Sequence, residues 1–130
     1  MPDPSPQPTV PGVLVPKPLL VALGGVAGSA LRWVTGEGLD DELATLLVVN
    51  GVGAFLFGAL LGHPRWRERE SLRLWLGTGF CGGLTTFSTL AAEVALRFDA
   101  GRAADALGFT AVTFVVGTTA GVLGLLVVRR

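Results

Sequence analysis

Four long stretches without a single charged residue constrain this chain more than any other feature of its sequence. They contain 14, 20, 19 and 23 residues, and they are Pro18–Leu31, Leu43–Gly62, Leu74–Ala92 and Ala106–Val128. A helix that crosses a membrane needs about 20 apolar residues. The last three stretches are long enough, and the first is long enough if it continues past Arg32 to about Val34. The sequence therefore predicts an all-α membrane protein with four transmembrane helices.

A soluble four-helix bundle is the alternative fold for such a pattern. Its helices would each carry a polar stripe that repeats about every 3.6 residues, and none of the four stretches has one. Charged residues make up 15 % of the chain, against roughly 25 % in an ordinary soluble domain. The composition therefore favours a lipid bilayer as the surroundings of this protein.

The charged and metal-binding residues exclude several classes of function. Ten basic residues balance ten acidic ones, so no net charge is present to attract nucleic acid. One histidine and one cysteine are too few for a zinc centre or a disulfide framework. We expect a protein that is not an enzyme.

Two regions of unequal size divide the chain. Residues 1–18 contain seven of the eight prolines, a composition that neither helix nor sheet accommodates, and they predict a disordered tail. Residues 19–130 form one transmembrane domain. Glycines recur there at helical spacing and predict close helix contacts. These glycine pairs are Gly24 and Gly28, Gly58 and Gly62, Gly79 and Gly83, and Gly117 and Gly121.

Polar side chains inside the apolar stretches are candidates for function, because each must find a partner or contact water. Asn50 lies midway along the second stretch, with Gly53 and Ala54 near it on the same helix face. Two interpretations stay open. The amide either joins two helices or contacts a ligand.

The third stretch carries the densest group of such residues. Residues 77–89 hold four glycines and five hydroxyl side chains, a composition that predicts a mid-membrane break between about Gly82 and Thr85. Carbonyls freed at a break can bind a hard cation, whereas amides at the start of the next half-helix favour an anion. A kinked helix without function is the alternative.

Further polar residues lie in the fourth stretch and at the ends of two others. Thr110 and Thr113 share one helix face and are candidates for a hydroxyl ladder, although threonine in a membrane helix commonly bonds the carbonyl four residues earlier. Arg32 and Glu93 each close an apolar stretch. Such charges either anchor the helix at the interface or set the charge of a vestibule.

Three of the four stretches together resemble a known family. The residues are Gly24-Gly25-x-x-Gly28-x-x-x-Arg32, Asn50-Gly51-x-Gly53, and Gly79-Phe80-Cys81-Gly82-Gly83-Leu84-Thr85-Thr86-Phe87-Ser88-Thr89. From about Leu19 to Arg130 the chain resembles the Fluc/CrcB fluoride channels. The resemblance implies a fluoride-selective channel in the cell membrane that exports cytoplasmic fluoride and lowers its toxicity. It also implies an antiparallel dimer with two pores.

The resemblance also implies roles for single residues. Backbone carbonyls of Gly82 and Thr85, from both subunits, are expected to hold a structural sodium ion at the centre of the dimer. The matching fluoride-pathway positions are Asn50, Phe87, Ser88 and Thr89. The family often has a second phenylalanine where this chain has Leu90.

Two other classes of membrane protein remain as alternatives. A proton-coupled small multidrug transporter is also a four-helix antiparallel dimer, but it needs a carboxylate within the membrane, and its only candidate here is Glu93, at the end of the third stretch. A non-transporting scaffold would leave the predicted break unexplained.

The basic residues predict the orientation of the chain. With four spans, one side carries Lys17, Arg65, Arg67, Arg69, Arg73, Arg129 and Arg130, and the other carries Arg32, Arg97 and Arg102. Basic loops stay in the cytoplasm, so both termini are expected there. A fixed orientation allows either a homodimer or a heterodimer with an oppositely oriented homologue.

Overall fold

The computed structural model describes residues 15–129, so residues 1–14 of the predicted tail lie outside the described residues. Within 15–129 the chain is helical and contains no strand. The elements in chain order are α1 (Lys17–Gly38), α2 (Glu42–Gly62), α3 (Pro64–Arg67), α4 (Glu70–Leu72), the π-helical segment η1 (Arg73–Cys81), α5 (Gly82–Leu84), α6 (Ser88–Asp99) and α7 (Ala103–Val127).

Three continuous helices, α1, α2 and α7, are long and apolar enough to cross a membrane. Helix α1 is longer than predicted, because it passes Val34 and ends at Gly38. The Thr35 hydroxyl donates to the Leu31 carbonyl at 2.8 Å, which satisfies this polar side chain within the last turns of α1. Asp41 then caps α2, since its carboxylate accepts the Ala44 N–H at 2.7 Å.

The third apolar stretch is divided among several elements. Helical backbone continues from Glu70 through η1 and α5 to Leu84, and α6 begins at Ser88. Thr85 is extended, with φ −76° and ψ 155°. Residues 85–87, called the interruption below, therefore follow the Gly82–Gly83 pair. The predicted position, between about Gly82 and Thr85, overlaps this interruption at Thr85, and the Gly82–Gly83 pair itself stays helical.

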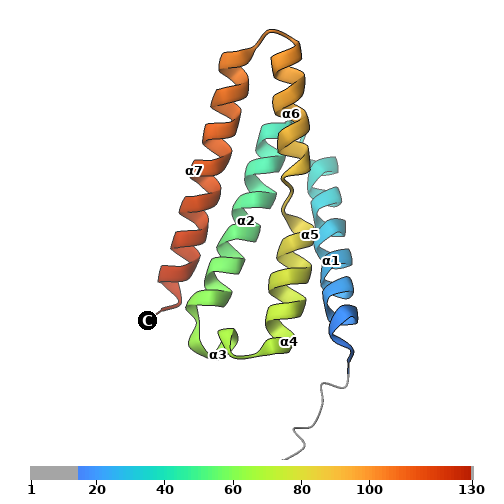
Figure 1. Cartoon of the computed structure of the whole chain (residues 1–130), viewed down its shortest axis with the longest axis vertical. Coiled ribbons are helices and arrows are strands. Elements are labelled where there is room, and N and C mark those ends of the chain that lie inside the picture. Colours follow the sequence, from blue (N-terminus) through green and yellow to red (C-terminus); the bar gives the residue numbers. More distant parts are fainter. Residues whose placement is uncertain (1–14, 130) are drawn as a thin grey trace, which may run out of the picture.

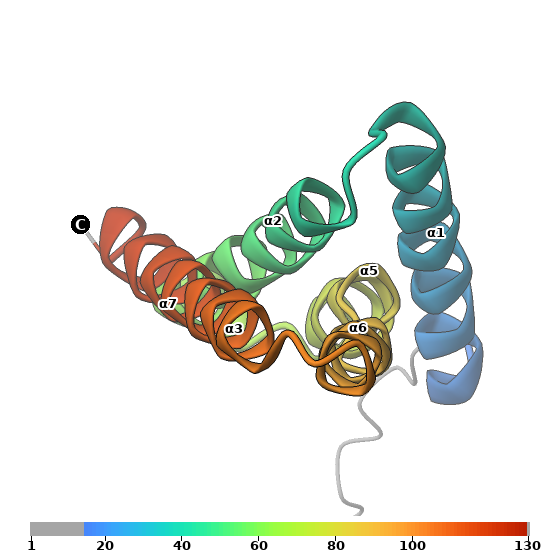
Figure 2. The ribbon, with the colours of Figure 1, turned by 90° about the horizontal axis from the view of Figure 1, so that it is seen from above.

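Two helix pairs make up the bundle (Figure 1). Helix α2 packs along α7, and α1 packs along η1 and α5. Seen from above, η1, α5 and α6 form a central column with α1 on one side and the α2–α7 pair on the other (Figure 2). The start of α1 and the end of α7 lie at the same end of the bundle (Figure 1).

Glycines permit these close contacts, as their spacing predicts. A Cβ at Gly28 would overlap the Phe80 carbonyl and lie 2.7 Å from the Leu84 amide nitrogen. A Cβ at Gly79 would lie 2.6 Å from the Val21 carbonyl oxygen. Gly58 and Gly62 approach the backbone of α7 in the same way. Gly117 differs from the other paired glycines, because its Cβ position meets open space.

Apolar side chains cover the outside of the bundle as well as its inside. Val26 is 69 % exposed, Trp33 67 % and Leu107 64 %, whereas Leu46, Leu90 and Phe109 form a small buried cluster. Large apolar side chains exposed around several long helices are stable in lipid rather than in water. The chain is a multi-pass membrane protein.

Candidate functional site

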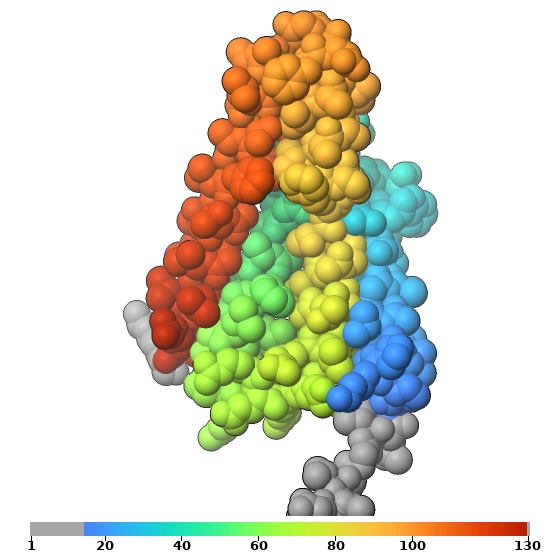
Figure 3. All heavy atoms as spheres, viewed as in Figure 1, coloured from blue at the N-terminus to red at the C-terminus, as the bar shows by residue number. Residues whose placement is uncertain are grey.

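A cavity of about 380 Å³ lies where the interruption faces α2 and α7. The space-filling view shows α2 set back between α7 and the η1–α5 segment (Figure 3). None of the ten lining residues carries a charge. They are Asn50, Ala54, Thr85, Thr86, Phe87, Leu90, Thr113, Phe114, Gly117 and Thr118.

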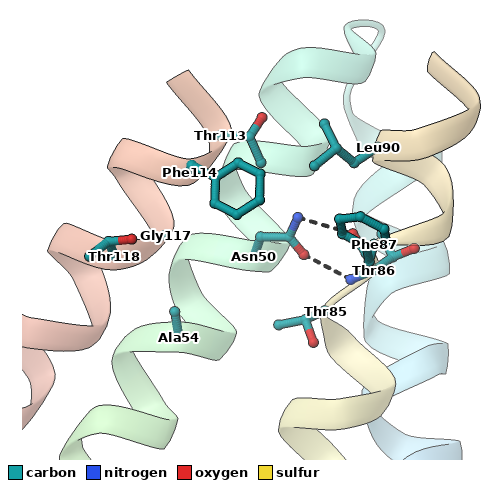
Figure 4. Close-up of a pocket in the computed structure, with 10 residues that line it drawn as sticks. All are labelled: Asn50, Ala54, Thr85, Thr86, Phe87, Leu90, Thr113, Phe114, Gly117 and Thr118. Carbon is teal, nitrogen blue, oxygen red and sulfur yellow. Dashed lines mark hydrogen bonds between the residues drawn. The ribbon is translucent and has the colours of Figure 1, made fainter. Parts of the chain in front are cut away.

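Asn50 holds the interruption with both ends of its amide. Its Nδ2 donates to the Thr86 carbonyl at 3.2 Å, and its Oδ1 accepts the Thr86 N–H at 2.8 Å (Figure 4). In a continuous helix that N–H would be donated to the Gly82 carbonyl. The side chain of Asn50 therefore replaces a helical hydrogen bond, and it joins two elements while lining the cavity. The two interpretations of Asn50 do not exclude each other.

Phe87 extends from the interruption and is 70 % exposed in the single chain. The hydroxyls of Thr86, Ser88 and Thr89 form hydrogen bonds with one another. Thr86 Oγ1 lies 3.2 Å from Ser88 Oγ and 3.0 Å from Thr89 Oγ1, and it accepts the Thr89 N–H at 3.2 Å. Among these predicted pathway residues, the structure places Phe87 at the cavity with Asn50. Ser88 and Thr89 are outside its lining, and Thr89 instead lines a separate cavity with Arg32.

The two predicted threonines of α7 are separated by the structure. Thr113 lines the cavity, whereas Thr110 does not. Each hydroxyl donates at 2.8 Å to a carbonyl four residues earlier, Thr110 to Ala106 and Thr113 to Phe109. Both hydroxyl protons are thus engaged within the helix. The structure does not bring the two residues together as one ladder along this cavity.

Phe114 and Thr118 complete the α7 side of the cavity, and neither was among the predicted pathway residues. Figure 4 shows the Phe114 ring extending from α7 toward the Asn50 amide. Residues 113, 114, 117 and 118 share the helical i, i+1, i+4, i+5 spacing, which is the signal that would have found them. Leu90, by contrast, is 4 % exposed and packs in the buried cluster with Leu46.

The two predicted vestibule charges have different surroundings. Arg32 Nη1 donates to the Thr85 carbonyl at 3.1 Å, so this guanidinium lies against the interruption. Glu93 is paired with Arg97 on the next turn of α6, and the Arg97 guanidinium lies 4.1 Å from the Phe109 ring centroid. The Arg97 guanidinium therefore pairs locally with the charge of Glu93.

The cavity combines chemistry that suits a small anion. One proton of the Asn50 Nδ2 group bonds Thr86, and the second remains for another acceptor. Phenyl rings present a positive edge, which Phe87 and Phe114 can supply. A cavity without a cationic side chain contacts an anion without trapping it.

Comparison with known proteins places the chain in a family. A family model described as CrcB-like protein, Camphor Resistance (CrcB), matches residues 19–125. A fluoride-specific ion channel FluC of Bordetella petrii is 41 % identical in an alignment of 114 residues, which covers 82 % of this chain and 87 % of that protein.

Two further relatives carry similar names. A fluoride-specific ion channel FluC 2 of Parasynechococcus marenigrum is 41 % identical over 112 residues, covering 86 % of this chain and 80 % of that protein. A fluoride-specific ion channel FluC of Dechloromonas aromatica is 39 % identical over 116 residues, covering 85 % of this chain and 86 % of that protein. The resemblance found in the sequence motifs is confirmed, and this chain belongs to the CrcB family.

Proposed function

We propose that this chain is a fluoride-selective ion channel of the cell membrane, which lets cytoplasmic fluoride leave and so lowers its toxicity. One observation carries the proposal. The cavity at the interruption joins the Asn50 amide, the Phe87 ring and the α7 face in an uncharged lining. The names of the relatives identify the anion, since each is called a fluoride-specific channel.

Fluoride is small and strongly hydrated, so a pore must replace lost water with several weak donors. The Asn50 amide and the edges of the phenyl rings supply such contacts directly. The Thr113 hydroxyl donates to the Phe109 carbonyl and supplies a donor only after it rotates. Thr118 extends the polar lining along α7. Ser88, Thr89 and Thr110 belong to the proposed pathway outside this cavity.

Phe114 supplies the second aromatic edge of the pathway in this proposal. Leu90, at the position where the family often has a phenylalanine, is buried in the core cluster. Leu90 and Phe114 both line the cavity with Phe87, but Leu90 is 4 % exposed and Phe114 is 55 % exposed. We expect Phe114→Leu to reduce fluoride efflux severalfold and Val115→Leu, a change at the adjacent α7 residue outside the cavity lining, to leave it unchanged. Equal rates in both variants would remove Phe114 from the pathway.

The oxygen donors at Gly82 and Thr85 fit a hard cation such as Na⁺. The N–H of Thr86 bonds Asn50 and leaves the Gly82 carbonyl without its helical donor. Thr85 accepts one hydrogen bond from Arg32, and a carbonyl oxygen has two lone pairs. A sodium ion bound there supplies fixed positive charge beside the anion path. Two oxygens are few for a hard cation, and a second copy would add its own Gly82 and Thr85 carbonyls to the proposed site.

The assembly in this proposal is an antiparallel dimer with two pores. The third stretch, η1 through α6, serves as the fourth span and is interrupted within the membrane. A second cavity of about 370 Å³ lies on the open side of Gly82, lined also by Gly53, Phe57 and Thr85. This face is available to a second copy or to an oppositely oriented homologue. In this proposal Arg32 and Glu93 set the charge of the vestibules.

The distribution of basic residues supports a fixed orientation with both termini in the cytoplasm. A reporter fused after Arg130 tests it in cells. Reporter activity on the cytoplasmic side alone supports a heterodimer with an oppositely oriented homologue. Equal cytoplasmic and external populations would instead support a homodimer of dually inserted chains.

Fluoride efflux from potassium-loaded proteoliposomes, followed with a fluoride electrode, tests the function. We expect rapid efflux of fluoride and none of chloride from vesicles with the purified chain, and no efflux from empty vesicles. Proton-coupled uptake of a cationic drug without fluoride efflux would establish the multidrug-transporter alternative. If the folded protein shows neither fluoride efflux nor drug uptake, the scaffold interpretation is supported instead.

A further inference from the structure

The end of the bundle that holds both described chain ends also holds a dense group of arginines. Residues 63–73 connect α2 to the π-helical segment, and they include Arg65, Arg67, Arg69 and Arg73. All four are exposed. The three ion pairs within residues 15–129 are Lys17–Glu70, Arg97–Glu93 and Arg102–Asp105, so none of these arginines takes part in one.

The acidic residues of this connection do not neutralise the arginines. The connection holds Glu68 and Glu70 against four arginines. Glu70 is bound to the Lys17 ammonium at 2.7 Å, which lowers the pKa of its carboxyl and uses its charge locally. A positive surplus therefore remains where α2 and η1 reach the edge of their apolar stretches. Figure 1 shows this connection, with α3 and α4, beside the start of α1.

A surface cavity of about 540 Å³ opens beside this group. Leu20, Leu72 and Trp75 give it an apolar wall, while Arg69, Glu70 and Ser71 give it a polar rim. Trp75 is 38 % exposed, and tryptophan characteristically lies at the level of lipid headgroups with its N–H toward water. The apolar wall of the cavity therefore matches the acyl chain of a phospholipid, and its basic polar rim matches an anionic headgroup.

We propose that this cavity binds an anionic phospholipid, with Arg69 on the phosphate of the headgroup and Leu20, Leu72 and Trp75 along the start of an acyl chain. Charge complementarity selects the occupant. A guanidinium forms paired hydrogen bonds with phosphate, and basic residues beside a membrane span attract anionic lipid. A zwitterionic lipid offers the same phosphate but adds a cation that the neighbouring arginines repel. The site is independent of the proposed anion pathway.

Trp75 provides a direct probe of occupancy. We would change Trp33 and Trp66 to phenylalanine, which leaves Trp75 as the single tryptophan. The full chain is reconstituted in vesicles that contain phosphatidylglycerol or phosphatidylcholine with brominated acyl chains, which quench a tryptophan in contact with them. We expect half-maximal quenching at about fivefold less phosphatidylglycerol than phosphatidylcholine, the ratio that corresponds to roughly 1 kcal/mol for one interfacial arginine.

Variants distinguish a defined site from general attraction. Arg69→Gln should abolish the preference for phosphatidylglycerol, and Arg69→Lys should keep part of it. Arg67→Gln is the matched control, because it removes the same charge from the same connection but lies outside the cavity lining. Equal quenching by both lipids in the Trp75 protein would overturn the proposal. So would equal loss of preference in the Arg67 and Arg69 variants, which would indicate diffuse charge attraction.

Discussion

Replacing Asn50 with alanine should release the interruption from α2. The side chain holds Thr86 through two hydrogen bonds of 3.2 Å and 2.8 Å, both with the backbone. A hydrogen bond contributes about 1 kcal/mol net, and about 0.6 kcal/mol between transmembrane helices. Losing both hydrogen bonds should therefore weaken the attachment of the interruption to α2 by about 1–2 kcal/mol. The fraction of molecules in which the interruption is detached from α2 then rises about 5- to 30-fold.

Fluoride efflux and thermal unfolding in detergent measure the two consequences separately. We expect Asn50→Ala to slow efflux more than tenfold and to lower the unfolding temperature, with the dimer still assembled. Asn50→Asp keeps an acceptor for the Thr86 N–H, but it replaces the donor to the Thr86 carbonyl with a carboxylate oxygen that repels it, so it should destabilise the interruption at least as much as Asn50→Ala. Its efflux should fall at least as far, because a carboxylate repels the anion. Wild-type efflux in both variants would refute the assignment of Asn50 to the pathway.

Three further predictions concern other parts of the bundle. Phe87→Ala should slow fluoride efflux more than tenfold while the unfolding temperature stays near that of the wild type, because this ring is largely exposed in the chain. Thr113→Val should reduce efflux severalfold and Thr110→Val should not, although each loses the same hydroxyl bond to a carbonyl, since Thr113 alone of the two lines the cavity. Gly28→Ala should destabilise the protein by about 1–3 kcal/mol in thermal unfolding, whereas Gly25→Ala should not, because its Cβ would lie 4.0 Å from the nearest α5–η1 atom, the Gly79 carbonyl oxygen. Equal unfolding temperatures for the two glycine variants would contradict the packing described for α1.

The apolar stretches located the long helices because lipid leaves few other ways to satisfy a backbone. They located helix ends less well. Arg32 ends the first charge-free stretch, yet α1 continues to Gly38, because a charged side chain can bond the interruption while its backbone stays helical. Absence of charge marks what is apolar, and backbone hydrogen bonding decides where a helix ends.

The site was predictable in its composition and less so in its geometry. Asn50 and Phe87 were identified from the sequence, and both line the cavity. The position of the interruption depends on a bond from α2 to Thr86, a contact between residues 36 apart in sequence. No local pattern of glycines reveals such a contact. Gly82 and Gly83 remain helical, and a Cβ at Gly83 would overlap the Gly25 carbonyl of α1, so close packing explains that glycine.

The Asn50–Thr86 contact also bears on the order in which the chain is made. In lipid, the N–H and carbonyl of Thr86 need a hydrogen-bond partner, and Asn50 provides it for both groups. Their partner is on α2, which precedes the third stretch in the sequence and leaves the ribosome first. Asn50 is therefore synthesised before Thr86. Asn50 thus provides the hydrogen bonds that lipid cannot give to Thr86. If the same side chain lay on a helix later in the sequence, Thr86 would be synthesised before its partner.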